Sequence, residues 1–514
     1  MLDSPSSLDL LGADALTTLV FLPTLGALLL AFLPAEAKRA IRWVGLLTTG
    51  AALLLSVKVA LLFDAAVPGI SGFRVDAPWI PRFGIWYRVG VDGLSLALVL
   101  LTTLLSFCVL LASSGQKIDR WKGYVAAFLV LETGMIGSLV ALDAILFYVF
   151  WEAMLIPMYF IIGIWGGKRR IYAAMKFVLF TLVGSLLMLV GILVTAGMHA
   201  KATGIQSFSI LDWTAASQAG RWALPADVEG LLFWAFALAF LVKVPLWPLH
   251  TWLPDAHVEA PTGGSVILAG VLLKLGTYGL MRFNLPLFPE ASARFAPLIG
   301  VLALIGVVYG AWVAAAQKDM KKLVAYSSVS HLALVVLGIF SFNSAAMAGA
   351  VFQMVGHGLT TGLLFLLVGV LYERRHTREM ADYGGVATYV PVTTTLFVIS
   401  ALGSVGLPGL NGFIGEFLIL GGVFQVNLVW CAVGATGLIL GAIYLLTLVQ
   451  KVFWGPEGPA ANRGLTDING WELAGALPMI ALVVVLGVFP APLLNLIRTS
   501  VEVVVQAASL RGAP

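Results

Sequence analysis

About fourteen apolar stretches, each long enough to cross a lipid bilayer, follow one another along this chain of 514 residues. In lipid, a segment must satisfy its own backbone hydrogen bonds, so long uninterrupted apolar stretches favour helices. With 60% hydrophobic and 11% charged residues, the chain lacks the charge of a soluble surface. The sequence therefore predicts an all-α integral membrane protein. The stretches centre near residues 24, 52, 102, 132, 152, 185, 240, 272, 305, 332, 360, 405, 438 and 484.

The distribution of Lys and Arg between these stretches predicts the orientation of the chain, because cytoplasmic loops carry an excess of basic residues. The N-terminal segment contains Asp3, Asp9 and Asp14 but no basic residue. We expect it on the periplasmic side of a bacterial cytoplasmic (inner) membrane, and an even number of spans returns the C-terminus to the same side. No cleavable signal peptide is expected, because the first stretch continues into the polytopic pattern. The basic loops lie near residues 38–42, 117–122, 168–170, 318–322, 374–378 and 451–463.

Lys243 and Lys274 lie in the middle of apolar stretches, where a lysine costs roughly 2.5–3.5 kcal/mol on insertion scales. A charge in this position indicates either a functional site or a structural ion pair, and we favour the functional interpretation for both. Lys243 shortly precedes Pro245, which removes a helix hydrogen bond, so we expect a helix break there. Lys58 and Lys176 lie nearer the ends of their stretches, where the ammonium group can reach the interface.

Glutamates within the spans could exchange protons with these lysines. Glu152, in ILFYVFWEAMLIPMYF, is flanked by large apolar and aromatic residues, so its carboxyl must face a partner or a wet cavity. A neighbouring carboxylate helps a lysine to keep its proton, whereas a second lysine helps it to lose the proton. We therefore expect a Glu152–Lys243 pair that controls proton binding. Glu132, on the preceding span, could share this role.

A second helix break is expected near Pro408, where repeated glycines interrupt the apolar stretch that contains Glu416. Broken helices are tolerated in a membrane only where protein or water satisfies the freed backbone groups. The breaks near Pro245 and Pro408 lie about five spans apart, and an ionisable residue accompanies each. This pattern predicts two inverted structural repeats with sites at the breaks. The glycines could alternatively serve close helix packing alone.

His331 and His357 lie on spans between the two breaks. Histidine changes charge near physiological pH and can donate from one nitrogen while it accepts at the other. A lone buried histidine is more often a satisfied core residue, but two of them between Lys274 and Glu416 could link these groups through water. The predicted catalytic proton path comprises Glu152, Lys243, Lys274, His331, His357 and Glu416.

One polar cluster has the composition of a metal site but not its spacing. Its residues lie around prolines in a loop, whereas helix-borne ligands would be spaced i, i+4. We interpret the cluster as the polar mouth of a water path and expect no metal ion. The four residues are His250, Asp255, His257 and Glu259.

We also expect no cofactor in this chain. Two cysteines, Cys108 and Cys431, exclude a disulfide framework and a cysteine-ligated iron–sulfur centre within it. The glycine-rich pieces lie within apolar spans and do not follow a strand, so they are not nucleotide fingerprints. NADH, flavin and nucleic acid are therefore not expected to bind here.

Five motifs, in order along the chain, resemble those of the antiporter-like membrane subunits of respiratory complex I. The likeness is dense from about residue 85 to residue 460 and loose at the ends. The loop from about Lys201 to Glu229 and the N-terminal fourteen residues match no pattern of that family. The motifs are FYVFWEAMLIPMYFIIGIWGG, KVPLWPLHTWLPDAHVEAPTGGSVILAGVLLKLGTYGLMRF, QKDMKKLVAYSSVSHLALVVLGIF, GHGLTTGLLFLLVGVLYERRHTREMADYGG and LPGLNGFIGEF.

The resemblance implies a fold of about fourteen helices with two inverted five-helix repeats, each with a broken helix, and a hydrated axis across the middle of the membrane. It places the six path residues on the proton path of the family. It also implies four parts: residues 1–120 with helices 1–3, residues 121–284 with the first repeat, residues 285–454 with the second repeat, and residues 455–514 with the last helix and tail.

By the same resemblance, the chain is a proton-translocating subunit of NADH:quinone oxidoreductase without a redox site of its own. NADH, FMN, iron–sulfur clusters and quinone are expected in other subunits. The expected partners are the other membrane-arm subunits, including neighbouring antiporter-like ones, the lipid bilayer, protons and water. Quinone reduction elsewhere would open or close the Glu152–Lys243 pair, and protons would move along Lys274, His331 and His357 to Glu416.

Other functions remain open at this point. The same family includes subunits of multi-chain cation/proton antiporters and of membrane-bound hydrogenases, although the WEAMLIPMYF and ERRHTREM pieces favour the respiratory complex. A passive scaffold would tolerate neutralisation of its charges within the spans. A free-standing secondary transporter would be stable and active alone in liposomes.

Overall fold

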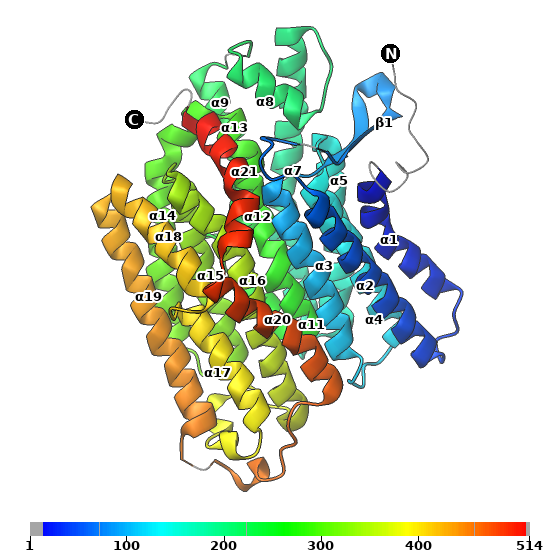
Figure 1. The fold of residues 1–514 in the computed structure, drawn as a ribbon, viewed down its shortest axis with the longest axis vertical. Coiled ribbons are helices and arrows are strands. Elements are labelled where there is room, and N and C mark those ends of the chain that lie inside the picture. The colour runs from blue at the N-terminus through cyan, green and yellow to red at the C-terminus, as the bar shows by residue number, and fades with distance from the viewer. Residues whose placement is uncertain (1–13, 71, 223, 457, 510–514) are drawn as a thin grey trace.

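Long apolar helices make up the protein and run between two opposite faces (Figure 1). The structure is a computed structural model that describes residues 14–70, 72–222, 224–456 and 458–509. Within these ranges, eleven helical segments are long and apolar enough to cross a membrane, and three further apolar helices are shorter. All fourteen expected centres lie within helices. The prediction of an all-α integral membrane protein is confirmed.

The first half of the chain forms the helices at the right of Figure 1, some of those at its top, and the first broken helix. Their bounds are α1 (Asp14–Ala31), α2 (Lys38–Leu62), α3 (Gly93–Ser113), α4 (Trp121–Val140), α5 (Ala144–Ala153), α6 (Leu155–Trp165), α7 (Arg170–Thr203), α8 (Ile210–Gln218), α9 (Ala226–Lys243) and α10 (Trp252–Glu259).

The next span is a composite of α-helical and π-helical turns, followed by three long helices. Its parts are α11 (Thr262–Ile267), η3 (Leu268–Leu272), α12 (Leu273–Gly279), η4 (Leu280–Asn284) and α13 (Leu285–Leu287). The helices that follow are α14 (Pro289–Ala315), α15 (Met320–Ile339) and α16 (Ser344–Arg375). The chain ends with α17 (Pro391–Val405), α18 (Asn411–Val426), α19 (Leu428–Val449), η7 (Gln450–Trp454), α20 (Gly470–Val488) and α21 (Ala491–Ser509). Short 3-10 turns are η2 (Pro81–Phe83), η5 (Met380–Asp382), η6 (Val386–Thr388) and η8 (Ala460–Asn462).

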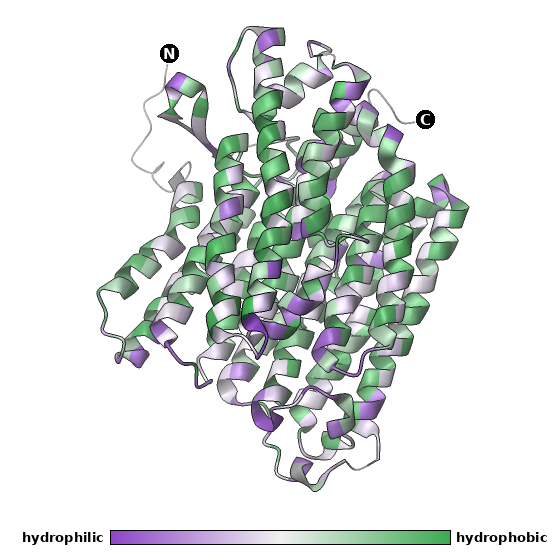
Figure 2. Ribbon diagram, turned by 180° about the vertical axis from the view of Figure 1, so that it is seen from behind, coloured by the Kyte–Doolittle hydropathy of each residue, from purple (hydrophilic) through white to green (hydrophobic). Residues whose placement is uncertain are grey.

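Figure 2 shows hydrophobic ribbon along the sides of the bundle and hydrophilic ribbon gathered mainly in the loops of its lower end. We call this end the basic face, because it carries the loops with Lys38, Lys117, Lys168, Lys318 and Arg378. A small two-stranded sheet marks the opposite end, which we call the hairpin face (Figure 1). This distribution of hydrophobic and polar residues is typical of a membrane-spanning protein.

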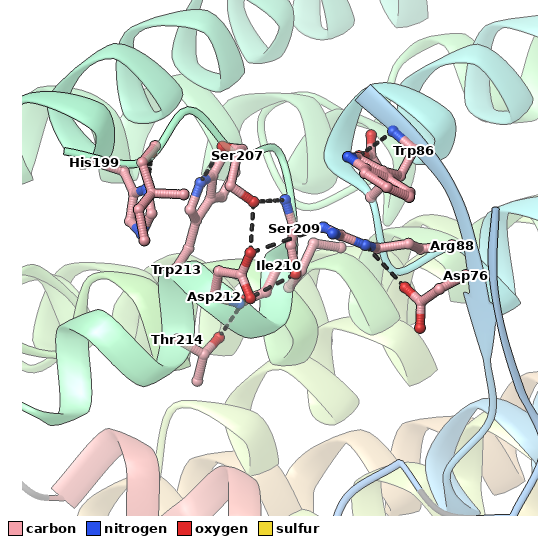
Figure 3. Close-up of polar contacts among 12 residues, drawn as sticks. Asp76, Trp86, Arg88, His199, Ser207, Ser209, Ile210, Asp212, Trp213 and Thr214 are labelled. Carbon is pink, nitrogen blue, oxygen red and sulfur yellow. Dashed lines mark hydrogen bonds and ion pairs between the residues drawn. The ribbon is translucent and has the colours of Figure 1, made fainter. Parts of the chain in front are cut away.

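The hairpin face contains an element that the sequence did not predict. Strands β1 (Arg74–Ile80) and β2 (Ile85–Gly90) pair antiparallel, and the turn between them includes Gly84 at φ 74°, in the left-handed region. The side chain of Arg88 binds Asp76 at 2.8 Å and approaches Asp212 of α8 to 3.8 Å (Figure 3). The loop from Lys201 to Glu229, which matched no family pattern, is thus tied to the hairpin. The first thirteen residues lie outside the described ranges.

Both predicted helix breaks are confirmed. Helix α9 ends at Lys243, directly before the Val-Pro pair, and the chain resumes a helix only at Trp252. Helix α17 ends at Val405, and Gly406 and Gly409 adopt φ angles of 82° and 93° before α18 begins. Glycine is required at these two positions because side chains with a Cβ disfavour the left-handed region.

Candidate functional site

Lys274 lies on α12, between the two π-helical segments of a span that is buried along its whole length. Its ammonium group donates to the carbonyl of Ala269, in η3, and lies 2.8 Å from Nδ1 of His357. Only 1% of the residue is exposed. Single π-helical turns occur often at functional sites. The span therefore holds its lysine inside the protein, directed at a histidine of α16.

A row of polar side chains continues from this contact. The rings of His357 and His331 lie 5.7 Å apart, and Nδ1 of His331 lies 3.2 Å from a carboxylate oxygen of Glu416. All of these side chains are buried, and they come from α12, α16, α15 and α18. The structure thus joins four of the six predicted residues in the order Lys274, His357, His331, Glu416. The expected order, with His331 directly after Lys274, is corrected, because α16 lies between α12 and α15 along this row.

Two members of the row escaped the sequence analysis. The amide of Gln353 donates to Glu416 at 3.3 Å, and the hydroxyl of Tyr444 lies 3.4 Å from Nε2 of His331. Gln353 precedes His357 by four residues, a spacing that places both on one face of α16. Tyr444 comes from a separate span, and the sequence carried no signal for it.

A small cavity lies beside Glu416 and His331. Its volume is about 10 Å³, and its polar lining includes Ser330 and Ser404. This space suffices for about one water molecule, which would have several polar partners there. The proposed link through water therefore fits the His331–Glu416 end of the row, whereas the Lys274–His357 contact is direct.

Lys243 and Glu152 form a second, separate group. The Lys243 ammonium lies 5.2 Å from the ring centre of Trp151 and 5.5 Å from that of Phe177, and no hydrogen-bond partner for it occurs among the described residues. Glu152 is partly buried, with Tyr148 and Ser185 beside its carboxyl. The predicted direct pair is not formed, since no Glu152–Lys243 contact within 4.0 Å occurs in the described ranges. The two charges still lie within electrostatic range of each other.

The two lysines face opposite sides of the contact between α9 and α12. At Gly276, a Cβ would lie 2.6 Å from the carbonyl oxygen of Phe240, so the two backbones pack directly against each other. Lys243 points toward the aromatic rings of α5 and α7, whereas Lys274 points toward α16. Nothing polar in the described ranges bridges them by a hydrogen bond or ion pair. The expected line from Lys243 to Lys274 is therefore interrupted within the described ranges, and the Lys243 ammonium faces an aromatic region that includes Trp151 and Phe177.

The structure adds two buried groups between Lys274 and the basic face. The ring of His257 stacks on Phe365 at 4.7 Å, with neither ring nitrogen hydrogen bonded in the described ranges, and it lies within electrostatic range of both Lys274 and Lys321. The ammonium of Lys321 donates to the carbonyl of Ala260 at 2.5 Å. The sequence had assigned Lys321 to a basic loop, whereas the residue lies in the first turn of α15 and is buried.

A cavity of about 310 Å³ opens on the basic face beside these groups. Its lining includes Lys321, Thr262 and the carboxylates Asp119, Glu259 and Glu373. Water can fill a polar space of this size. The prediction that this loop forms the mouth of a water path thus gains a specific site.

The four residues of the polar cluster, for which we expected no metal ion, have different contacts in the structure. Asp255 forms an ion pair with Lys176 at 2.7 Å, Glu259 accepts from the backbone of the 166–169 turn, and His250 lies 5.2 Å from the Tyr309 ring centre. The ammonium of Lys176, which we expected to reach the interface, binds the partly exposed carboxylate of Asp255. Lys58 is partly exposed on α2. Glu132 is fully buried, and both of its carboxyl oxygens lack a hydrogen-bond partner in the described ranges.

Known proteins share the part of the chain that contains these residues. The family described as "NADH:quinone oxidoreductase/Mrp antiporter, TM" matches residues 141–441, which hold all six predicted path residues. The chain belongs to this NADH:quinone oxidoreductase/Mrp antiporter family. Its two helix breaks and the four row residues Lys274, His357, His331 and Glu416 lie within the matched range. The resemblance of the five motifs is thereby confirmed.

Relatives within this family extend over nearly the whole chain. NADH-quinone oxidoreductase subunit M of Rhodobacter capsulatus is 47% identical over 501 residues, which cover 96% of each chain. The subunit of the same name from Escherichia coli K12 is 42% identical over 467 residues, covering 88% of this chain and 90% of that one. A chain of respiratory complex I from Thermus thermophilus with bound NADH is 36% identical, with a TM-score of 0.86 over 97% of this chain and 100% of that one.

The protein is therefore an antiporter-like, proton-translocating integral membrane subunit, and it sits in a multi-subunit membrane complex. These relatives do not favour the alternative of a separate cation/proton antiporter.

Proposed function

We propose that this chain carries protons across the membrane arm of an NADH:quinone oxidoreductase along Lys274, His357, His331 and Glu416. The observation that carries the proposal is the contiguous, buried contact series between these four side chains. Burying ionisable groups in a membrane is costly, and a row of them across a bundle marks an ion pathway. Histidines between a lysine and a glutamate can take and release protons at physiological pH.

Protons reach Lys274 from the basic face in this proposal. The polar cavity at Thr262 brings water to Lys321, and His257 lies within electrostatic range of both that lysine and Lys274. Neither ring nitrogen of His257 has a hydrogen-bond partner among the described groups, so one can donate to a water while the other accepts a proton. The basic face is then the cytoplasmic side, and the chain begins and ends on the periplasmic side.

Lys243 and Glu152 act as the switch. In the arrangement seen here the ammonium rests against Trp151 and Phe177, out of contact with the row. Water that enters the aromatic region between Lys243 and Lys274 would connect them, and a dry region would separate them again. Each proton moved against the membrane potential requires about 2.3 kcal/mol per 100 mV. Quinone reduction elsewhere in the complex supplies this energy, so the chain works as a translocase component without a redox site.

The proposal also covers the cofactors, the partners and the repeats of the chain. NADH, FMN, iron–sulfur clusters and quinone belong to other subunits, and the chain binds no cofactor. Its partners are neighbouring membrane-arm subunits, including antiporter-like ones. Residues 121–284 and 285–454 form two inverted repeats, each with one of the breaks.

The decisive experiment replaces Glu416 by Gln in the assembled complex and measures protons pumped per NADH oxidised in membrane vesicles. We expect pumping to fall, because an amide cannot accept the proton at the end of the row. Glu502→Gln, on the exposed side of α21, is the matched control and leaves pumping unchanged. Undiminished pumping in Glu416→Gln would support a passive scaffold instead. Undiminished coupling in Glu152→Gln would remove Glu152 from the switch.

A further inference from the structure

An open cavity of about 760 Å³ lies between the basic-face ends of α1, α2 and α4. Its rim carries Lys38, Arg120 and Lys122, and Trp121 forms part of its wall. A second cavity, of about 430 Å³, adjoins it, shares Lys38 and Trp121, and adds Arg42 and Lys117. Figure 1 shows α1 and its turn into α2, which contribute to the larger cavity, at the edge of the bundle. Neither cavity belongs to the path described above.

Five basic side chains thus meet at these cavities, and no ion pair within 4.0 Å involves any of them in the described ranges. The lining also contains Glu36 and Asp119, which neutralise none of the five by contact. Lys122 donates to the carbonyls of Ala31 and Leu33, and the Arg42 guanidinium lies 5.1 Å from the Trp471 ring centre. The Nε of Arg42 is buried without a hydrogen-bond partner among the described groups.

The helix ends at this place add to the unbalanced positive potential. Helices α2 and α4 both begin here, with no side-chain cap and no acidic residue in the first turn. The N-terminus of a helix carries free N–H groups and a partial positive charge, so Lys38, at the start of α2, stands in an unfavourable position beside Arg42. They are also like charges at i, i+4, which repel. An anion in the cavity would relieve all of these interactions.

The deeper walls of the larger cavity are apolar. They include Ala27, Leu30 and Ala126, and the outer side of α1 exposes Leu25 and Leu29. A ligand that fits this site has an anionic head at the level of the basic loops and hydrocarbon that extends along the helices. Free phosphate has no hydrocarbon to contact the apolar walls. An acidic protein segment would not extend into the membrane along the helices.

We propose that these adjoining cavities bind the headgroup of an anionic phospholipid from the leaflet at the basic face. The phosphate lies between Lys38, Arg120 and the uncapped N-termini, and the acyl chains lie along α1 and α4. Basic pockets between helices on the cytoplasmic side of membrane proteins suit such headgroups. The site is independent of the proton path.

The test uses the purified, assembled complex in nanodiscs of phosphatidylcholine doped with a photoreactive phosphatidylglycerol. A second sample contains photoreactive phosphatidylcholine with the same acyl chain. After illumination, mass spectrometry identifies the labelled peptides. We expect phosphatidylglycerol, and not phosphatidylcholine, to label the α1–α2 turn and the start of α4. Millimolar inorganic phosphate leaves this labelling unchanged.

Lys38→Gln and Arg120→Gln remove two exposed charges from the rim, and labelling falls about fivefold for each, the effect of roughly one interfacial charge. The matched control, Lys318→Gln with Lys322→Gln, removes two exposed charges elsewhere on the basic face and leaves labelling unchanged. Lys38→Arg keeps the positive charge and is labelled as strongly as the unchanged complex. This result shows that the Gln variant loses labelling through its charge and not through misfolding. Equal labelling by phosphatidylcholine, displacement by phosphate, full labelling in the Gln variants, or labelling of a neighbouring subunit seated on α1 would each overturn the proposal.

Discussion

The ammonium of Lys274 lies 2.8 Å from Nδ1 of His357, although 83 positions separate the two residues in the sequence. A protonated lysine only donates, so Nδ1 must accept and a neutral His357 must carry its proton on Nε2. That nitrogen has no partner among the described groups. The contact therefore fixes the tautomer of a neutral His357 beside a protonated Lys274. A proton that passes from Lys274 to Nδ1 makes the Nε2 proton available on the other side of the ring.

This geometry predicts that His357→Ala blocks proton transfer between Lys274 and His331. General acid–base groups contribute about 100-fold or more to a proton transfer, so we expect pumping to become about 100-fold slower. The measurement is the rate of proton uptake into vesicles during NADH oxidation. His376→Asn is the control, because His376 is exposed and adopts a left-handed backbone that asparagine tolerates. Normal pumping in His357→Ala would show that water bypasses the ring.

Tyr444→Phe tests a residue that the sequence did not reveal. The substitution removes one hydroxyl 3.4 Å from Nε2 of His331 and keeps the ring that packs around it. A hydrogen bond contributes about 1 kcal/mol, so the rate of proton transfer at His331 should fall about fivefold.

The control for this variant is Tyr372→Phe, which removes a hydroxyl from an exposed tyrosine of α16 at the basic face. Its ring still contacts Arg378. Equal pumping rates in the two variants would mean that Tyr444 only fills space.

The sequence predicted the helices and the breaks well, because each depends on local chemistry. Apolar length marks a span, and the prolines and glycines around Pro245 and Gly406 mark the ends of helices. It also found the four ionisable members of the row, since groups such as Lys274 and Glu416 are costly wherever they point in a membrane.

The partners of these residues were harder to predict. Helix α16 is buried along most of its length, so its sequence does not indicate which neighbouring helix His357 meets. The direction of Lys243, toward Trp151 and away from Lys274, depends on how α9 packs on α12. That packing rests on Gly276, whose role is visible only when the two backbones are in place. The partner of Lys176 was not predicted for the same reason, because Asp255 lies 79 positions away.

Trp151 is predicted to hold Lys243 in its resting position. Replacement by Leu removes the ring face 5.2 Å from the ammonium, whereas replacement by Phe keeps a smaller one. A desolvated cation–π contact contributes about 2 kcal/mol. We expect Trp151→Leu to lower the number of protons pumped per NADH and Trp151→Phe to retain most of it. Assembly of both variants is checked by NADH oxidation in detergent. If both pumped equally, the ring would not position the lysine.

The ion pair between Arg282 and Asp92 is predicted to stabilise the hairpin end of the composite span. The two groups lie 2.7 Å apart, with side chains 12% and 5% exposed, and Arg282 also donates to the hydroxyl of Tyr278. Asp92→Ala would leave a buried cation unpaired, at a cost of about 3–5 kcal/mol. We expect a large loss of assembled complex, measured by native electrophoresis and thermal melting.

The double variant, Asp92→Ala with Arg282→Met, separates the pair from its parts. It removes both charges, so part of the lost stability should return, and the four melting temperatures form a double-mutant cycle. Arg74→Ala is the control at the same face, because its pair with Asp76 is 45% and 34% exposed and such pairs contribute at most about 1 kcal/mol. If the double variant were less stable than Asp92→Ala alone, Arg282 would act through Tyr278 and the carbonyl of Leu139 that this hydroxyl binds, not through the carboxylate.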